Sequence, residues 1–420
     1  MTGKNPLKMP VFDTVFLPAP LRSLTLLLAF IITVFMLCIT VSCKKTVTTT
    51  TVNTKNYPAV QAAFGSNIDL NSLENYAAQP IPNYITRDNS GADPITNAGA
   101  TLGRVLFYDK NLSVSNTIAC ASCHKQSMAF GDSLIQSHGV NGLTTRHAMR
   151  LVNARFAQEV RFFWDKRAAT LEDQTTQPIQ NHNEMGYSGL NGDPDINAMI
   201  AKIQAIGYYK ELFTFVYGDA TITQTRLQNA LAQFIRSIQS FDSKYDTGMA
   251  SVNNINASFP NFTTQENLGK QLFIAPPSPP GAALVNGAGC QACHRSPEFD
   301  INPTSKNNGI IGVAGNPLLT DLISTNPPSL RNLLDPNGKV NGLYMHDGSL
   351  TNLQAVINHY NLITVSAANT NLDPKLLPGG QPQNLRLNQT QKNAIAAFLA
   401  TLSGKDVYTN KKWSSPFINF

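Results

Sequence analysis

The stretches that decide the fold are CASCH at residues 120–124 and CQACH at residues 290–294. Both have the pattern C-x-x-C-H, the attachment sequence of c-type haem. Two thiols three residues apart on a tight helical turn can add to the two vinyl groups of one porphyrin, and the adjacent histidine then lies beneath the iron as its proximal ligand. The sequence therefore predicts two covalently bound c-type haems, held by Cys120, Cys123, His124, Cys290, Cys293 and His294.

A four-cysteine zinc site and redox-active thiols are the alternative interpretations, because C-x-x-C alone serves all three purposes. A histidine directly after both cysteine pairs favours haem. The two histidines, His124 and His294, are accordingly the predicted iron ligands.

The sequence around the two motifs is repeated. LGRVLF at residues 102–107 precedes the first motif, and LGKQLF at residues 268–273 precedes the second at a similar distance. Farther on, NALAQFI at residues 229–235 matches NAIAAFL at residues 393–399, and both have apolar residues at helical spacing. We therefore expect a mostly α, loop-rich chain of two tandem cytochrome c-like domains, each with one covalent haem.

Residues that interrupt helices and strands indicate where the domains begin and end. Residues 276–289 and 374–382 contain too many Pro and Gly residues for strands or long helices. Gly, Ser and Asn cluster near residues 247–262, where we place the domain boundary. The predicted domains are residues 61–250 and residues 262–410, each with one haem.

Composition limits the class of protein. The chain has 420 residues, of which 42% are hydrophobic, so it can bury a large core and is neither disordered nor a small disulfide scaffold. Charged residues make up only 14% and the formal net charge is +6. Because the sequence has no basic block, we expect no nucleic-acid partner.

The N-terminus indicates export. An apolar run at residues 24–41 follows Arg22, and Ser42, Cys43, two lysines and a Thr-rich tract come next. This pattern resembles a bacterial lipoprotein signal, so residues 1–42 are predicted to be a signal peptide, Cys43 to be lipidated, and residues 43–60 to be a flexible tether. An uncleaved membrane helix is the alternative. Either interpretation puts the rest of the chain in the periplasm or cell envelope.

From residue 161 to residue 188 the chain reads RFFWDKRAATLEDQTTQPIQNHNEMGYS. FFWDKRA at 162–168, Gln174, Pro178 and EMG at 184–186 resemble, in order and spacing, motifs of the bacterial di-haem cytochrome c peroxidase and MauG family. SLRN at 329–332 and YMHDG at 344–348 resemble motifs of its second half. The similarity covers about residues 95–405, and it implies that the N-terminal haem reacts with peroxide while the C-terminal haem transfers electrons.

The resemblance implies catalytic roles for Glu184, Trp164 and Gln174. Splitting the O–O bond of peroxide requires a proton to move from one oxygen to the other, and a carboxylate such as Glu184 can carry it. Trp164 resembles the tryptophan between the two haems, where an indole can support electron transfer. Without the resemblance, Glu184 would be interpreted as a helix-start carboxylate and Trp164 as a buried core residue.

The sixth ligand of the C-terminal haem has three candidates. Tyr360 stands fourteen residues after His346, where the peroxidases have a methionine, and a tyrosine there resembles the MauG branch. Tyrosinate stabilises ferric iron, whereas a thioether, which Met345 could supply, raises the potential. His359 is a third candidate, which we expect instead on a helix surface.

The first half departs from the family in its histidines. Peroxidases that need reductive activation carry a distal histidine ligand, and here Gly139 stands at the matching position, with His138 one residue away. His138 is either that ligand or a solvent-facing residue. His147 replaces an asparagine that often ligates calcium; because imidazole is a poor ligand for this cation, calcium is a doubtful cofactor. We expect His182 to be structural or exposed.

The sequence thus predicts a di-haem c-type peroxidase that reduces hydrogen peroxide to water. Its expected partners are a small electron-donor protein, such as a cytochrome c or a cupredoxin, and a membrane reached through the lipid anchor. The alternatives are a MauG-like oxidase that acts on a protein or organic substrate and a non-catalytic di-haem electron carrier.

Overall fold

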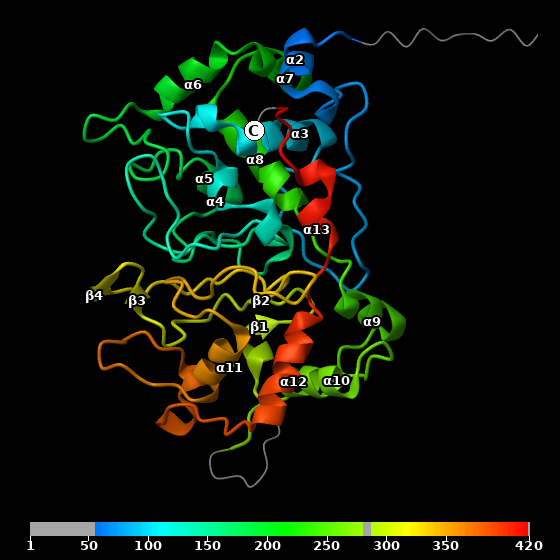
Figure 1. The fold of residues 1–420 in the computed structure, drawn as a ribbon, viewed down its shortest axis with the longest axis vertical. Coiled ribbons are helices and arrows are strands. Elements are labelled where there is room, and N and C mark those ends of the chain that lie inside the picture. The colour runs from blue at the N-terminus through cyan, green and yellow to red at the C-terminus, as the bar shows by residue number, and fades with distance from the viewer. Residues whose placement is uncertain (1–54, 280–286, 419–420) are drawn as a thin grey trace, which may run out of the picture. The chain divides into compact units, whose positions relative to one another are not determined.

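The protein is described by a computed structural model covering residues 55–279 and 287–418. Within these residues it is mostly α-helical and loop-rich, as predicted, with only two small antiparallel sheets, β1–β2 and β3–β4 (Figure 1). The strands are β1 (His294–Arg295), β2 (Asp300–Ile301), β3 (Gly312–Val313) and β4 (Asn316–Thr320). The helices are α2 (Pro58–Phe64), α3 (Asn97–Tyr108), α4 (Cys120–Cys123), α5 (Leu171–Thr175), α6 (Ile196–Gln204), α7 (Gly207–Tyr217), α8 (Gln224–Ser237), α9 (Lys244–Val252), α10 (Thr264–Ile274), α11 (Leu353–Asn361), α12 (Gln389–Ala400) and α13 (Asp406–Thr409).

The repeated sequences form two helix pairs. Helix α3 packs on α8, and α10 packs on α12 (Figure 1). A Cβ atom at Gly103 would lie 1.9 Å from the carbonyl oxygen of Ala230, and one at Gly269 would lie 1.8 Å from that of Ala394. Only glycine allows the two backbones to approach this closely. The repeated glycine and alanine therefore mark the crossing point of each helix pair.

Each helix pair carries its own hydrophobic cluster. Phe107 and Phe234 are buried in the cluster of the first half, and Phe273 and Phe398 occupy the corresponding places in the second. The rings of each pair lie 5.2 Å apart, centroid to centroid. The duplicated architecture agrees with the repeat in the sequence. That each half is a cytochrome c-like domain with its own haem stays a prediction.

The N-terminal edge differs from the predicted tether. Cys43 and the signal at residues 1–42 lie outside the described residues, but α2 begins at Pro58, inside the range 43–60. The Glu211 carboxylate accepts hydrogen bonds from the backbone N–H groups of Ala59 and Val60, and the side chain of Val60 is buried. The last three residues of the predicted tether are therefore folded. Among the described helices, none is both long and apolar enough to span a membrane.

The predicted domain boundary is partly helical. Helix α9 covers residues 244–252, and its Met249 is buried in the second hydrophobic cluster. Gly248 is needed for packing, because a Cβ atom there would lie 2.3 Å from the ring of Phe259. A glycine that contributed to the predicted boundary therefore permits close packing of a helix.

The C-terminal end also crosses the predicted limits. Val407 and Trp413 belong to the first hydrophobic cluster, although the predicted second domain extends to residue 410. The indole of Trp413 donates to the Ser237 hydroxyl (3.3 Å), and the Tyr108 hydroxyl donates to the Trp413 carbonyl (2.6 Å). The last segment of the described chain thus completes the core of the first half.

Candidate functional site

The first attachment motif forms α4, a single helical turn. The Ala119 N–H donates to the Ser122 hydroxyl at its start, and the His124 N–H donates to the Cys120 carbonyl at its end (2.9 Å). Cys123 and His124 line a cavity of about 180 Å³, here called the first cavity, and both also line an adjoining cavity of about 70 Å³ together with Cys120. The tight turn therefore presents two free thiols and an imidazole to one space.

The imidazole of His124 has the protonation pattern that an iron ligand needs. Its Nδ1 lies 3.1 Å from the Phe130 carbonyl oxygen, which can only accept, so Nδ1 carries the proton. Nε2 is then the unprotonated ring nitrogen, whose lone pair can bind a metal.

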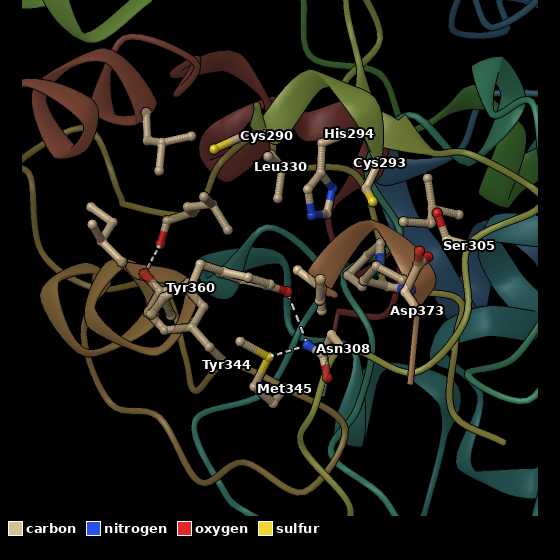
Figure 2. Close-up of a pocket in the computed structure, with 18 of the residues that line it drawn as sticks. Cys290, Cys293, His294, Ser305, Asn308, Leu330, Tyr344, Met345, Tyr360 and Asp373 are labelled. Carbon is tan, nitrogen blue, oxygen red and sulfur yellow. Dashed lines mark hydrogen bonds between the residues drawn. The ribbon is translucent and has the colours of Figure 1, made fainter. Parts of the chain in front are cut away.

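The second motif is a 3₁₀ turn (Cys290–Ala292) that leads into β1. Cys290, Cys293 and His294 line a cavity of about 290 Å³, here called the second cavity (Figure 2). Burial lowers the pKa of His294 to about 4, which keeps its imidazole neutral, and its buried Nδ1 has no hydrogen-bond partner. A buried, unpaired ring nitrogen beside two free thiols fits a c-type haem.

The chemistry of the thiols argues against the two alternative interpretations. Burial raises the pKa values of Cys120 and Cys290 to about 12, whereas redox-active thiols require a lowered pKa. In the part of the chain that the structure describes, no cluster of three or more His, Cys, Asp or Glu residues could hold a metal ion, so a four-cysteine zinc site is not supported. The donor set fits haem better than either alternative.

Glu184 and Gln174 lie beside the first motif, as the sequence suggested. Both line the first cavity and the adjoining small one, together with His124. Burial raises the pKa of Glu184 to about 7, and the charge of the Arg167 guanidinium opposes this increase in part. A carboxyl group with this pKa can both accept and release a proton near neutral pH.

The His138 loop packs against Glu184 without presenting a histidine. The Val140 N–H donates to the Glu184 carbonyl (3.0 Å), and a Cβ atom at Gly139 would lie 2.6 Å from the Glu184 Cα atom. Gly139 lines the small cavity, whereas His138 is exposed and lines none of the three cavities. Of the two interpretations of His138, the structure supports the solvent-facing residue.

Trp164 lies between the two larger cavities and lines both. Its side chain is 9% exposed, its indole N–H donates to the His147 carbonyl (2.8 Å), and its ring meets that of His346 edge to face. These contacts hold the indole in one orientation. The placement agrees with the predicted position between two haems and with the simpler interpretation as a core residue.

Tyr360 and Met345 both line the second cavity, and one side chain joins them (Figure 2). The Asn308 amide donates to the Tyr360 hydroxyl (2.9 Å) and to the Met345 sulfur (3.3 Å). The structure thus brings both predicted ligand candidates to the cavity. Sequence reasoning missed Asn308, because it lies 37 residues before Met345 and belongs to no motif.

The remaining histidines have structural contacts. His359 is half-buried and not on the helix surface as expected: it bonds the Asn308 carbonyl through Nε2 (2.9 Å), because Asn308 packs against this end of α11. His182 is exposed and bonds Asp193, as expected. His147 is buried and bonds the Leu134 carbonyl through Nδ1 (2.7 Å), so that ring atom is not free for calcium.

Comparison with known proteins gives the class. The profile of the di-haem cytochrome c peroxidase family matches residues 97–254. The methylamine utilization protein MauG of Methylophilus methylotrophus is 29% identical over 325 residues, which are 74% of this chain and 84% of that protein. The cytochrome c551 peroxidase of Nitrosomonas europaea is 26% identical over 324 residues, or 73% of this chain and 80% of that protein.

A solved structure agrees with these matches. The crystal structure of a MauG-like protein associated with microbial copper homeostasis is similar with a TM-score of 0.63 and 25% identity, covering 80% of this chain and 98% of that one. The chain is related to members of the di-haem cytochrome c peroxidase and MauG family. Because these relatives carry both names, the comparisons support a haem-dependent oxidoreductase and leave peroxidase and MauG-like oxidase as separate hypotheses.

Proposed function

We propose that this chain is an exported di-haem c-type peroxidase that reduces hydrogen peroxide to water. The observation that carries the proposal is Glu184, a carboxyl group with a pKa of about 7 in the cavity that His124 lines. Electrons come from a small donor protein, such as a cytochrome c or a cupredoxin.

The proposed reaction consumes two electrons and two protons for each peroxide and releases two molecules of water. When bound, haem supplies the redox chemistry at iron. Glu184 accepts a proton from one peroxide oxygen and returns it to the other, which becomes the leaving water. The amide of Gln174 lines the same space and offers a hydrogen bond to a small polar ligand.

Trp164 is the proposed link between the two centres. It lines both cavities, so it connects the site that takes electrons from the donor with the site that consumes them. In this assignment His294, with Tyr360 or Met345, holds the electron-transfer haem, and His124 holds the peroxide-reacting haem.

Replacing Glu184 by Gln tests the proposal. The amide keeps the size of the side chain but cannot accept the proton, so peroxide turnover should fall by a factor on the order of 10² to 10⁴. Glu159→Gln is the matched control, because Glu159 lines the same cavity but is paired with Lys166 (2.8 Å). Wild-type turnover by the Glu184 variant would contradict the proposal and favour the electron carrier.

The MauG-like oxidase, which would act on a protein or organic substrate, is the second candidate. It is favoured by Tyr360, which lines the second cavity at the position that resembles the MauG branch. Electron paramagnetic resonance of the isolated protein separates both enzymes from the electron carrier, because it distinguishes high-spin from low-spin iron at each centre. The carrier requires six-coordinate iron at both centres, and the exposed His138 gives no support for that.

Lipid attachment at Cys43 is part of the proposal and rests on the sequence alone. Several acyl chains would hold the protein on a membrane where one would not. Cys43→Ala should change both the membrane partition and the apparent mass of the protein; an unchanged partition and mass would indicate an uncleaved helix instead.

A further inference from the structure

Arg150 is half-buried, and no carboxylate of the described chain neutralises its charge. Its Nε atom is buried and has no hydrogen-bond partner, and its nearest bonded contact is the Ser329 carbonyl at 3.5 Å from Nη2. Within residues 55–279 and 287–418, no carboxylate lies within ion-pair distance of it. A desolvated charge without a partner is strongly unfavourable.

Three other arginines of the protein differ from Arg150 in their ion-pair partners or in their exposure to solvent. Arg331 is fully buried, and its guanidinium is paired with Asp246 at 2.9 Å. Arg146 lines the first cavity as Arg150 does, and it is paired with Asp165 and Asp321. Arg161 lines that cavity without a carboxylate but is exposed. Of these four, Arg150 alone is half-buried and has no carboxylate partner.

The position of Arg150 indicates which anionic group could pair with its guanidinium. It lines the first and the second cavity, next to Trp164, which also lines both. The groups proposed for these cavities are two haems, whose ionised parts are their propionate carboxylates. A guanidinium has five N–H donors in a planar arrangement that matches carboxylates, so one arginine can bind more than one of them.

We infer that Arg150 forms ion pairs with propionates of both haems. This inference rests on the proposed pair of haems and adds a residue that binds both of them. Its positive charge stabilises the reduced form of each iron relative to the oxidised form, and it acts on the two centres together. Arg150 is therefore a positioning residue for the cofactors and raises both reduction potentials.

The test is the pair of midpoint potentials of the holoprotein, measured by spectroelectrochemistry. Arg150→Met keeps the length of the side chain without the charge. The equilibrium constant for one-electron reduction should fall about tenfold at both haems, a shift of about 59 mV each. Arg150→Lys should restore most of the shift, because it keeps the charge. Arg161→Met is the control, since the charge of an exposed arginine is screened by solvent.

Unchanged potentials, or a shift at only one haem, would overturn the inference. Redox-difference infrared spectra of the wild-type protein with isotope-labelled propionates provide a test that needs no variant: ionised, ion-paired propionates are expected, and protonated ones would overturn the inference. The haem count of the wild type separates the two proposals. Fewer than two haems contradicts the proposed function, whereas two haems with unaltered potentials in Arg150→Met contradict only the role of Arg150.

Discussion

The two cavities share an attachment motif and a pair of crossing helices, yet they differ in their other side chains. The first cavity contains Glu184, a carboxyl group poised to exchange protons. The second contains Tyr360 and Met345, two groups able to bind iron, and the Asn308 amide that holds them. The repeated helices therefore supply a common scaffold, while residues from loops and from α11 set the chemistry of each half.

Removing the two thiols of one motif should make the largest difference between the two halves. The double substitution of Cys290 and Cys293 by Ala should remove one haem and leave the other, because each motif supplies both thioether bonds of one porphyrin. The equivalent change at Cys120 and Cys123 should remove the other haem and abolish peroxide turnover. Denaturing mass spectrometry gives the count. Loss of both haems from either variant would show that the halves do not bind haem independently.

The helix crossings predict similar stability effects in both halves. Gly103→Ala and Gly269→Ala each push a methyl group into a backbone carbonyl, so each should destabilise the protein by about 1–3 kcal/mol. Denaturant unfolding of the holoprotein measures this. Gly91→Ala is the control, because a Cβ atom there meets nothing within 4 Å. A large cost at only one crossing would mean that the two helix pairs are not equivalent.

A pH profile should separate the cavities further. Because burial raises the pKa of Glu184 to about 7, its carboxyl is protonated below that pH and cannot accept the peroxide proton. The value of kcat/KM for peroxide should therefore fall about tenfold for each pH unit below 7 and level off above it. Asp300 lines the same cavity and its pKa is raised to about 6 by burial, so Asp300→Asn is the control. If the pH profile shifted in the Asp300→Asn variant, Asp300 and not Glu184 would be the titrating group.

Substituting Asn308 should have the smallest effect on the difference between the two cavities. Asn308→Leu removes the donor that Tyr360 and Met345 share, at a cost of about 0.5–1.5 kcal/mol. Electron paramagnetic resonance should show a changed signal from the second centre and an unchanged signal from the first, which serves as the internal reference. An altered first signal would mean that the two cavities are coupled through more than Trp164.

The features predicted from sequence were those that local patterns encode. The thiols and histidines are adjacent in the chain, and the helix pairs follow from apolar periodicity and a repeated glycine, so all of them could be placed before the structure. The ordered FFWD and EMG motifs led to Trp164 and Glu184 in the same way.

Residues that act through distant contacts could not be found this way. Asn308 reaches Tyr360 from 52 positions away, and Arg150 is notable only because no carboxylate comes near it after folding. The prediction of a domain boundary at residues 247–262 missed helix α9 for a related reason: in the sequence Gly248 indicates a break in secondary structure, and only the fold shows that Phe259 packs against it. Burial and pairing are properties of the folded chain, and short sequence patterns do not record them.

Because the C-terminal segment packs into the core of the first half, it limits when that core can be completed during biosynthesis. Trp413 is 1% exposed in the cluster built mainly from residues 60–238, so the first half lacks part of its core until nearly the whole polypeptide has been made. Domains usually fold in the order of synthesis, from the N-terminus onward. Here the half that is made first is finished last, and clipping a few residues from the end of the chain would loosen the Glu184 half before the Tyr360 half.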